Sequence, residues 1–209
     1  MKFLGIALLL IPVSVSEFPV TDLMERYEVE PFIIERPEQP MTPETLNSFL
    51  LPSCLALFPE KYNTPEARAL LIAIALQESD LKHRQQLVGN HRNWWESVNG
   101  PATSYWQFEK IGIQGVLEHR RTGELARIVL DRLGYPVDVP TIHKAIAHND
   151  ILAVCMARLA LYRLPQALPT RGQPEIAWRQ YVEAWRPGKP KPERWNERFA
   201  KAWEVVAGT

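Results

Sequence analysis

The chain has 209 residues, of which 46% are hydrophobic and 23% charged, so it is long enough for one domain with a sizeable core and is typical of a globular protein. Lysine and arginine together number 24, as do aspartate and glutamate, and this balance argues against nucleic acid or an anionic membrane as the partner. Cys54 and Cys155 lack the spacing of metal ligands, so the sequence indicates no metal site and no cofactor. Cys155 lies in an apolar segment and is expected to be buried, and a single disulfide between the two cysteines stays open.

Residues 1–16 form an apolar N-terminal segment. One lysine precedes an apolar run from Phe3 to Val15, and Ser14 and Ser16 form a small-x-small pattern. This pattern is typical of an export signal cleaved after Ser16. The alternative is an apolar arm that is buried or bound by a partner protein. The run is too short for an ordinary transmembrane helix, and contact of residues 1–16 with a membrane stays open.

Residues 17–41 contain four prolines and many glutamates without a sustained period. This composition predicts an extended arm or linker. We expect the arm to lie outside the core of a domain that covers residues 42–209.

Two helices are predicted at the start of this domain. Thr42 and Thr64 are each followed by proline, the combination of an N-cap residue and a first-turn residue. The first helix, or its periodic part, is expected to end at Pro52. The second is expected to run to about Asp80.

Further helices are predicted along the rest of the chain. The segments are 113–120, then "TGELARIVLDRLGYP", "HNDILAVCMARLALYRLP" and "PEIAWRQYVEAW", and last a helix with a stripe of Trp195, Phe199 and Trp203. The second of the quoted segments is the most apolar and is expected at the centre of the core. We find no convincing alternating pattern, so any sheet is expected to be small and near residues 86–109. The predicted fold class is mainly α.

Glu78 ends an otherwise apolar helical face. Ala67, Leu71, Ile74 and Glu78 are spaced so that all four lie on one side of the helix. An apolar environment and the negative end of the helix dipole both raise the pKa of a carboxyl group. A carboxylic acid that is protonated near neutral pH is what glycosidic cleavage needs. The alternative is a glutamate that swings out at the helix end and is solvated.

A second stretch, "SVNGPATSYWQFE" (97–109), has a composition suited to sugar binding. Its Gly-Pro-Ala turn permits close approach of the backbone to a ligand. Tyr105 and Trp106 offer flat faces to a pyranose ring, and Gln107 offers a donor and an acceptor to an N-acetyl group. Core packing is the alternative for Trp106. Trp94 and Trp95 lie side by side in a polar loop, so at least one of them is expected at the surface.

Together, "ALQES" and "SVNGPATSYWQ" resemble the paired motifs of soluble lytic transglycosylases and goose-type lysozymes, in which a helix ending in Glu-Ser is followed by Ser-x-x-Gly-Ala-x-Gly-Leu-Met-Gln. From about residue 41 to 203 the chain is similar to small bacteriophage proteins of this type, including a late "W…Y…WRPGKP…W" segment. The resemblance implies a lysozyme-like α-helical fold and cleavage of the MurNAc–GlcNAc bond of peptidoglycan, without a metal.

Residue by residue, the resemblance implies that Glu78 is the catalytic acid and base. It also implies that Ser97 and Gln107 match the motif serine and glutamine beside the sugar. The family also has a late Ala-Tyr-Asn-Ala-Gly turn, and its tyrosine has two candidates here, Tyr181 and Trp185. The chain departs from the family pattern in a longer gap before the second motif, in Ser-Tyr at 104–105 for Gly-Leu, and in the missing Tyr-Asn pair.

The resemblance implies that Glu78 first protonates the glycosidic oxygen and then takes the C6 hydroxyl proton, which gives a 1,6-anhydro product. A hydrolase would need a second carboxylate, and Glu109 and Asp80 are the candidates. The expected setting is a virion or, after export, the bacterial cell envelope. In the virion, residues 1–40 would bind other virion proteins. The alternative function is a virion structural or ejection protein that keeps the fold with little or no activity.

The segment "YVEAWRPGKPKPERW" (181–195) is expected to close over the groove opposite Gln107. Its three prolines stiffen the turn. Tyr181 or Trp185 would then lie near Glu78, and Lys189 and Lys191 would face carboxylates of the muropeptide. The alternative is a rigid connector between two helices, with solvated lysines.

Overall fold

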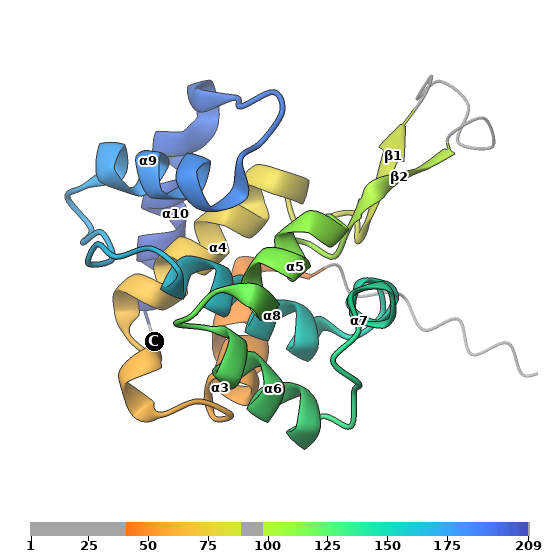
Figure 1. Cartoon of the computed structure of the whole chain (residues 1–209). Coiled ribbons are helices and arrows are strands. Elements are labelled where there is room, and N and C mark those ends of the chain that lie inside the picture. The colour runs from red at the N-terminus through yellow and green to blue at the C-terminus, as the bar shows by residue number, and fades with distance from the viewer. Residues whose placement is uncertain (1–40, 89–97, 209) are drawn as a thin grey trace, which may run out of the picture. The chain divides into compact units, whose positions relative to one another are not determined.

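The computed structural model describes residues 41–88 and 98–208. Predictions for the export signal and arm, and for Ser97, Trp94 and Trp95, lie outside these residues. The described chain is mainly helical, with one small sheet (Figure 1), as the sequence predicts. Its elements are α2 (Pro43–Thr45), η1 (Leu46–Leu50), α3 (Leu51–Leu55), η2 (Glu60–Tyr62), α4 (Pro65–Ser79), β1 (Gln85–Val88), β2 (Val98–Thr103), α5 (Lys110–Glu118), α6 (Gly123–Arg132), α7 (Val139–Ala145), α8 (Asp150–Tyr162), α9 (Pro174–Trp185), η4 (Pro192–Arg194) and α10 (Trp195–Ala207).

The first helical segment continues past Pro52. Thr42 caps it by accepting a hydrogen bond from the backbone N–H of Thr45, as predicted. The helix then widens into the π-helical stretch η1, where the N–H of Leu51 bonds to the carbonyl of Leu46. Pro52 follows directly in α3, which runs to Leu55. The helix itself therefore does not end at Pro52, whereas its regular α-helical period does break before the proline, in the wider turn of η1, which agrees with the other form of the expectation.

Helices α4 and α8 form the centre of the core. Thr64 caps α4 through a hydrogen bond from the N–H of Ala67, and Asn149 caps α8 through one from the N–H of Leu152. Every residue of α8 from Leu152 to Leu161 is buried, which confirms its predicted central place. Because α4 is also buried along most of its length, its C-terminal turn is held rigidly against the rest of the domain.

The two last long helices contribute an aromatic cluster beside α4. Helix α10 packs along α4 and buries the predicted stripe of Trp195, Phe199 and Trp203. The ring of Trp195 stacks between Tyr181 of α9 and Phe199, with ring centroids 5.2 and 6.1 Å away. Aromatic packing of this kind fixes α9 relative to α4. It therefore also fixes the position of Tyr181 relative to the C-terminal end of α4.

The small sheet is an antiparallel pair of β1 and β2 that extends from the helices (Figure 1). Gln85 pairs with Thr103 and Leu87 with Asn99, with an irregularity in register between them. Its position agrees with the expected sheet near residues 86–109. Strand β2 leads directly into the turn that approaches the end of α4.

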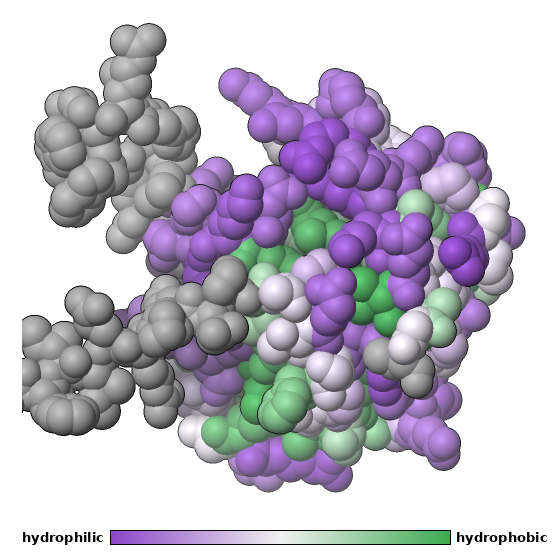
Figure 2. All heavy atoms as spheres, turned by 180° about the vertical axis from the view of Figure 1, so that it is seen from behind, coloured by the Kyte–Doolittle hydropathy of each residue, from purple (hydrophilic) through white to green (hydrophobic). Residues whose placement is uncertain are grey.

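Hydrophilic side chains cover much of the reverse face of the molecule, with smaller apolar patches between them (Figure 2). The exposed large hydrophobic residues of the described chain are Phe49, Ile111, Ile128 and Val137. Within residues 41–88 and 98–208, no helix has the length and hydrophobicity needed to cross a membrane.

Candidate active site

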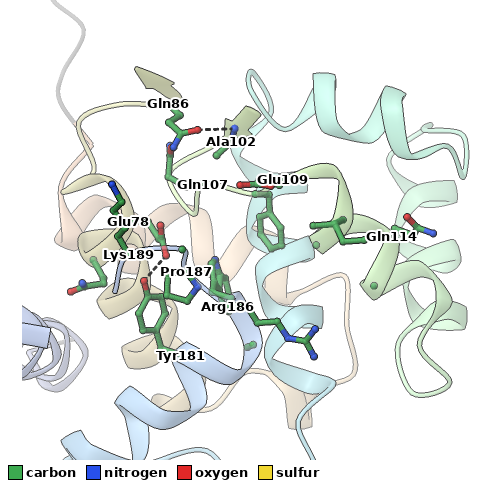
Figure 3. Close-up of a pocket in the computed structure, with 18 of the residues that line it drawn as sticks. Glu78, Gln86, Ala102, Gln107, Glu109, Gln114, Tyr181, Arg186, Pro187 and Lys189 are labelled. Atoms are coloured by element: carbon green, nitrogen blue, oxygen red, sulfur yellow. Dashed lines mark hydrogen bonds between the residues drawn. The ribbon is translucent and has the colours of Figure 1, made fainter. Parts of the chain in front are cut away.

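A cleft of about 900 Å³ opens beside the C-terminal end of α4 (Figure 3). Helix α5 forms one wall, and the end of α9 with the turn after it forms another. The residues that line it include Gln77, Glu78, Gln107, Glu109, Gly115, Glu118, Arg163, Tyr181, Trp185, Arg186, Lys189 and Lys191. Glu78 therefore lies in a cleft rather than in bulk solvent.

Glu78 and Tyr181 form the central contact of this cleft (Figure 3). The hydroxyl of Tyr181 donates a 2.7 Å hydrogen bond to Oε1 of Glu78. Tyr181 is buried and Glu78 is half-buried. The prediction that Tyr181 or Trp185 lies beside Glu78 is thus confirmed for Tyr181.

Burial changes the acidity of both groups. Burial raises the pKa of Glu78 to about 7, and the Tyr181 hydroxyl and the charge of Arg198 oppose this rise. Burial, followed by the charge of Glu78 and the hydrogen bond to it, raises the pKa of Tyr181 above its ordinary value. Glu78 can therefore hold a proton near neutral pH and also release it, while Tyr181 stays a hydrogen-bond donor.

Arg198 of α10 binds two residues at the C-terminal end of α4. Its Nη1 donates to Oε1 of Gln77 at 2.8 Å, and its Nη2 donates to Oδ1 of Asp80 at 2.8 Å. Asp80 also accepts a 3.4 Å bond from the exposed Arg194. The residues on both sides of Glu78 are thus fixed by one buried guanidinium.

The turn from Thr103 to Phe108 packs against the same helix end. Its two end residues are joined by a pair of backbone hydrogen bonds, of 2.7 and 2.9 Å. Ser79 donates its hydroxyl proton to the carbonyl of Tyr105 at 2.9 Å, which ties this turn to α4. Ser104 has a positive φ of 68°. The serine therefore takes the backbone conformation that glycine favours.

Gln107 lines the cleft as predicted. Its side-chain nitrogen donates to the carbonyls of Ser104 and His83, at 2.8 and 3.3 Å. These bonds fix the amide and leave its oxygen as the acceptor that a ligand in the cleft would meet.

Tyr105 and Trp106 do not line the cleft, and the expectation that they bind sugar through their rings is wrong. The ring of Tyr105 is buried against the guanidinium of Arg84, at 4.6 Å. Trp106 is fully buried, and its Nε1 donates a 2.9 Å hydrogen bond to the carbonyl of Leu71. The alternative, core packing, is the outcome for Trp106, because its one polar atom finds a backbone partner inside the domain.

The turn after α9 does reach the cleft. Trp185 is half-buried, lines the cleft, and donates its Nε1 proton to the carbonyl of Trp106 at 2.9 Å. Lys189 and Lys191 line the same cleft, as does Gln107. The turn thus reaches the cleft as expected, whereas Lys189 and Lys191 are exposed, and their contact with muropeptide carboxylates stays a prediction beside the alternative of solvated lysines.

The two candidates for a second carboxylate differ in position. Glu109 is exposed and lines the cleft. Asp80 is outside the lining of the cleft and is paired with Arg194 and Arg198. The structure thus contradicts the suggestion that Asp80 faces a substrate beside Glu78.

Arg198 and Arg163 were missed by sequence reasoning. A signal was present for Arg198: it falls on the buried stripe of α10, between Trp195 and Ala202, where an arginine needs a partner. Arg163 follows the apolar α8 directly and carries no comparable signal.

Comparison of the chain with family models, curated proteins and solved structures found no match. Within residues 41–88 and 98–208, no group of three or more His, Cys, Asp or Glu side chains is arranged to hold a metal ion.

Proposed function

We propose that the chain is a peptidoglycan-cleaving enzyme with a lysozyme-like fold, a lytic transglycosylase that cuts the MurNAc–GlcNAc bond. The observation that carries the proposal is Glu78, whose carboxyl group has a pKa raised to about 7 in a cleft where Tyr181 fixes it. A protonated carboxyl group held in a cleft is suited to protonate a glycosidic oxygen. The sequence motifs around Glu78 and Gln107 support the same assignment.

In this mechanism Glu78 donates its proton to the leaving oxygen as the bond to the anomeric carbon breaks. The carboxylate then accepts the proton of the C6 hydroxyl, whose oxygen bonds to the anomeric carbon and closes the 1,6-anhydro ring. Tyr181 donates to the carboxyl throughout and orients it. Gln107 presents its amide oxygen to the sugar, for which an N-acetyl N–H is a suitable donor.

The choice of transglycosylase over hydrolase rests on the sequence resemblance, and the carboxylates near Glu78 define the alternative. Asp80 is held in ion pairs outside the cleft, so Glu109 is the one suspected second carboxylate that lines it. An inverting hydrolase would use such a group to activate water. Analysis of soluble products by mass spectrometry tests this choice, because an anhydro product contains one water less than a reducing one.

The decisive experiment is digestion of purified peptidoglycan by the wild-type chain, Glu78→Gln and Glu109→Gln. We expect Glu78→Gln to lose about 10²–10⁴-fold in rate, the usual range for a general acid, with its thermal stability retained. Glu109→Gln serves as the matched control and is expected to keep most of the activity. If Glu78→Gln clears peptidoglycan as fast as the wild type does, Glu78 is not the catalytic acid.

The proposed setting is a bacteriophage virion or the bacterial envelope after export, with residues 1–40 binding virion proteins in the first case. Inactivity of the wild-type chain on peptidoglycan would favour the alternative, a virion structural or ejection protein with this fold.

A further inference from the structure

Arg163 lies in the cleft with an incomplete set of partners. It follows α8 directly and is half-buried against α5, where a Cβ on Gly115 would meet its Nη1 at 2.4 Å. Its Nη2 donates to the carbonyl of Ala184 at 3.0 Å, and its buried Nε has no hydrogen-bond partner. The guanidinium is thus held in place by backbone contacts rather than by an acidic side chain.

Arg186 brings a second guanidinium to this region. It follows α9 in a left-handed conformation with φ of 50°, and its backbone N–H bonds to the carbonyl of Val182 at 2.9 Å. Burial and the neighbouring charge of Arg186 both lower the pKa of Arg163. Within residues 41–88 and 98–208, neither arginine has a carboxylate within ion-pair distance.

Two neighbouring guanidinium groups repel each other unless an anion lies between them. Arginine binds carboxylates through two parallel hydrogen bonds, and this geometry makes it a carboxylate-selective residue. Lys189 and Lys191 add further positive charge to the cleft, and Glu109 and Glu118 flank the α5 residue Gly115 against which Arg163 packs. A neutral sugar chain offers no charge to these cations, whereas a peptide that carries carboxylates does.

We propose that Arg163 and Arg186 form a carboxylate-binding subsite for the peptide attached to the MurNAc residue of the glycan. The inference rests on the proposed function, because it assigns the cleft a peptidoglycan strand. The enzyme would then prefer strands that carry stem peptides over bare glycan.

The test measures binding by calorimetry to the inactive Glu78→Gln chain, with two probes. One is a soluble disaccharide–tetrapeptide muropeptide, and the other is chitohexaose, which has no carboxylate. Adding Arg186→Gln should weaken muropeptide binding about tenfold, the value of one charge-assisted contact, and leave chitohexaose binding unchanged. Gly115→Ala, which displaces the Arg163 guanidinium without removing its charge, should also weaken muropeptide binding selectively.

Arg179→Gln is the matched control, since Arg179 is exposed on α9 and outside the cleft. It should leave both affinities unchanged. Undiminished muropeptide binding by Arg186→Gln, or equal loss for the two probes, would overturn the subsite alone. Binding of neither probe by Glu78→Gln would overturn the proposed function and the subsite with it.

A separate observation concerns the two cysteines. Cys54 of α3 and Cys155 of α8 are both buried, and their sulfur atoms lie 2.7 Å apart. This distance is closer than unbonded sulfur atoms ordinarily approach, although it is longer than the ~2.05 Å bond of a disulfide, and both cysteines are free in this structure. Burial raises the pKa of the Cys54 thiol well above its ordinary value, so the reactive thiolate is disfavoured once the helices have packed.

We infer that Cys54 and Cys155 form a disulfide that joins α3 to α8 when the chain folds in an oxidising compartment. The oxidant is a disulfide, such as oxidised glutathione. One cysteine thiolate attacks it, which forms a mixed disulfide and releases one glutathione thiolate. The second cysteine thiolate then attacks the cysteine sulfur of the mixed disulfide and releases the other, and both leave as protonated thiols. The bond forms before α3 docks on α8, while a thiolate is accessible, and is then shielded from reductant. It would close a loop of 101 positions, and long loops gain most from closure.

The test refolds the reduced full-length chain in a mixture of oxidised and reduced glutathione. The chain is then quenched in acid, denatured, alkylated with N-ethylmaleimide and weighed by mass spectrometry. We expect a mass two hydrogens below the reduced chain and no alkyl group. Two alkyl groups per chain would overturn the inference. Reduction in denaturant, where the bond is accessible, followed by refolding under reducing conditions should also lower the Tm of the wild type but not that of Cys54→Ala/Cys155→Ala.

Discussion

The hydroxyl of Tyr181 reaches Oε1 of Glu78 across 103 positions of sequence and donates a 2.7 Å hydrogen bond to it. The contact joins the last turn of α4 to the middle of α9, two helices that the aromatic cluster around Trp195 holds together. The position of the proposed acid is therefore set by core packing rather than by a mobile loop.

Activity on peptidoglycan should fall as the pH rises through about 7. The proposed step needs the protonated form of Glu78, whose pKa is raised to about 7 mainly by burial. The alkaline limb of kcat/KM against pH, measured with a soluble glycan substrate, reports this group in the free enzyme. A limb that stays in place in the residual activity of Glu78→Gln would assign the titration to a different residue.

Tyr181→Phe and Trp185→Phe should have different effects. The first variant loses a hydrogen bond that lowers the pKa of Glu78, so the alkaline limb should move to higher pH while the rate at neutral pH falls about tenfold. The second loses the bond to the carbonyl of Trp106, so its main effect should be a loss of about 1 kcal/mol in stability. A pH profile of each variant, with thermal unfolding, separates the two outcomes; identical profiles for wild type and Tyr181→Phe would contradict this role.

Arg198→Met should both destabilise the domain and change the acidity of Glu78. It removes a buried guanidinium bound to Asp80 and Gln77, and we expect a loss of about 2 kcal/mol because Asp80 keeps Arg194 as a partner. The pKa of Glu78 should rise further without this positive charge. Arg194→Met removes an exposed partner of the same aspartate and is the control, expected to cost under about 1 kcal/mol and to leave the pH profile unchanged.

Glu78 should also make stability depend on pH. Its pKa is raised from 4.5 to about 7, so the folded chain binds this proton more tightly than the unfolded chain. The resulting stabilisation is complete below pH 4.5 and is lost as the pH rises to about 7. Denaturant unfolding should therefore show the wild type losing about 2 kcal/mol relative to Glu78→Gln over this interval, less than the full shift implies because the side chain is only half-buried.

Trp106→Phe should affect stability and leave substrate binding unchanged. The variant loses the hydrogen bond from Nε1 to the buried carbonyl of Leu71 and part of a fully buried ring, at a cost of about 2 kcal/mol. KM on a soluble glycan should stay constant, because the side chain lies in the core. A large rise in KM with unchanged stability would contradict this and show that Trp106 contacts the substrate.

Helical periodicity identified Glu78 because the residue continues an apolar face that the core must cover. It could not decide the orientation of Trp106, since a flat ring next to a Gly-Pro turn has the same sequence whether it faces a sugar or the core. The hydrogen bond to Leu71 that fixes the ring depends on packing between segments 35 positions apart.

Helix α7 was missed for a different reason. It has seven residues, and only Ile142 among them is buried, so it has no periodic stripe to detect. Its start does carry a signal, because Asp138 caps it through the N–H of Thr141 and Pro140 lies in its first turn. For a short helix with little burial, the capping residues are therefore a better indication than the periodicity of its apolar residues.

Every non-glycine residue with positive φ among residues 41–88 and 98–208 lies at an end of a segment that builds the cleft: Asp80, Leu81, Ser104, Gln107 and Arg186. A left-handed backbone costs an ordinary residue about 1 kcal/mol, so the domain stores conformational energy around its proposed acid. Glycine at Arg186 would relieve this backbone cost, but it would also remove a guanidinium that lines the cleft. At Asp80 the same change would leave the buried Arg198 without its carboxylate partner. The cost of these turns is therefore tied to the side chains that shape the cleft.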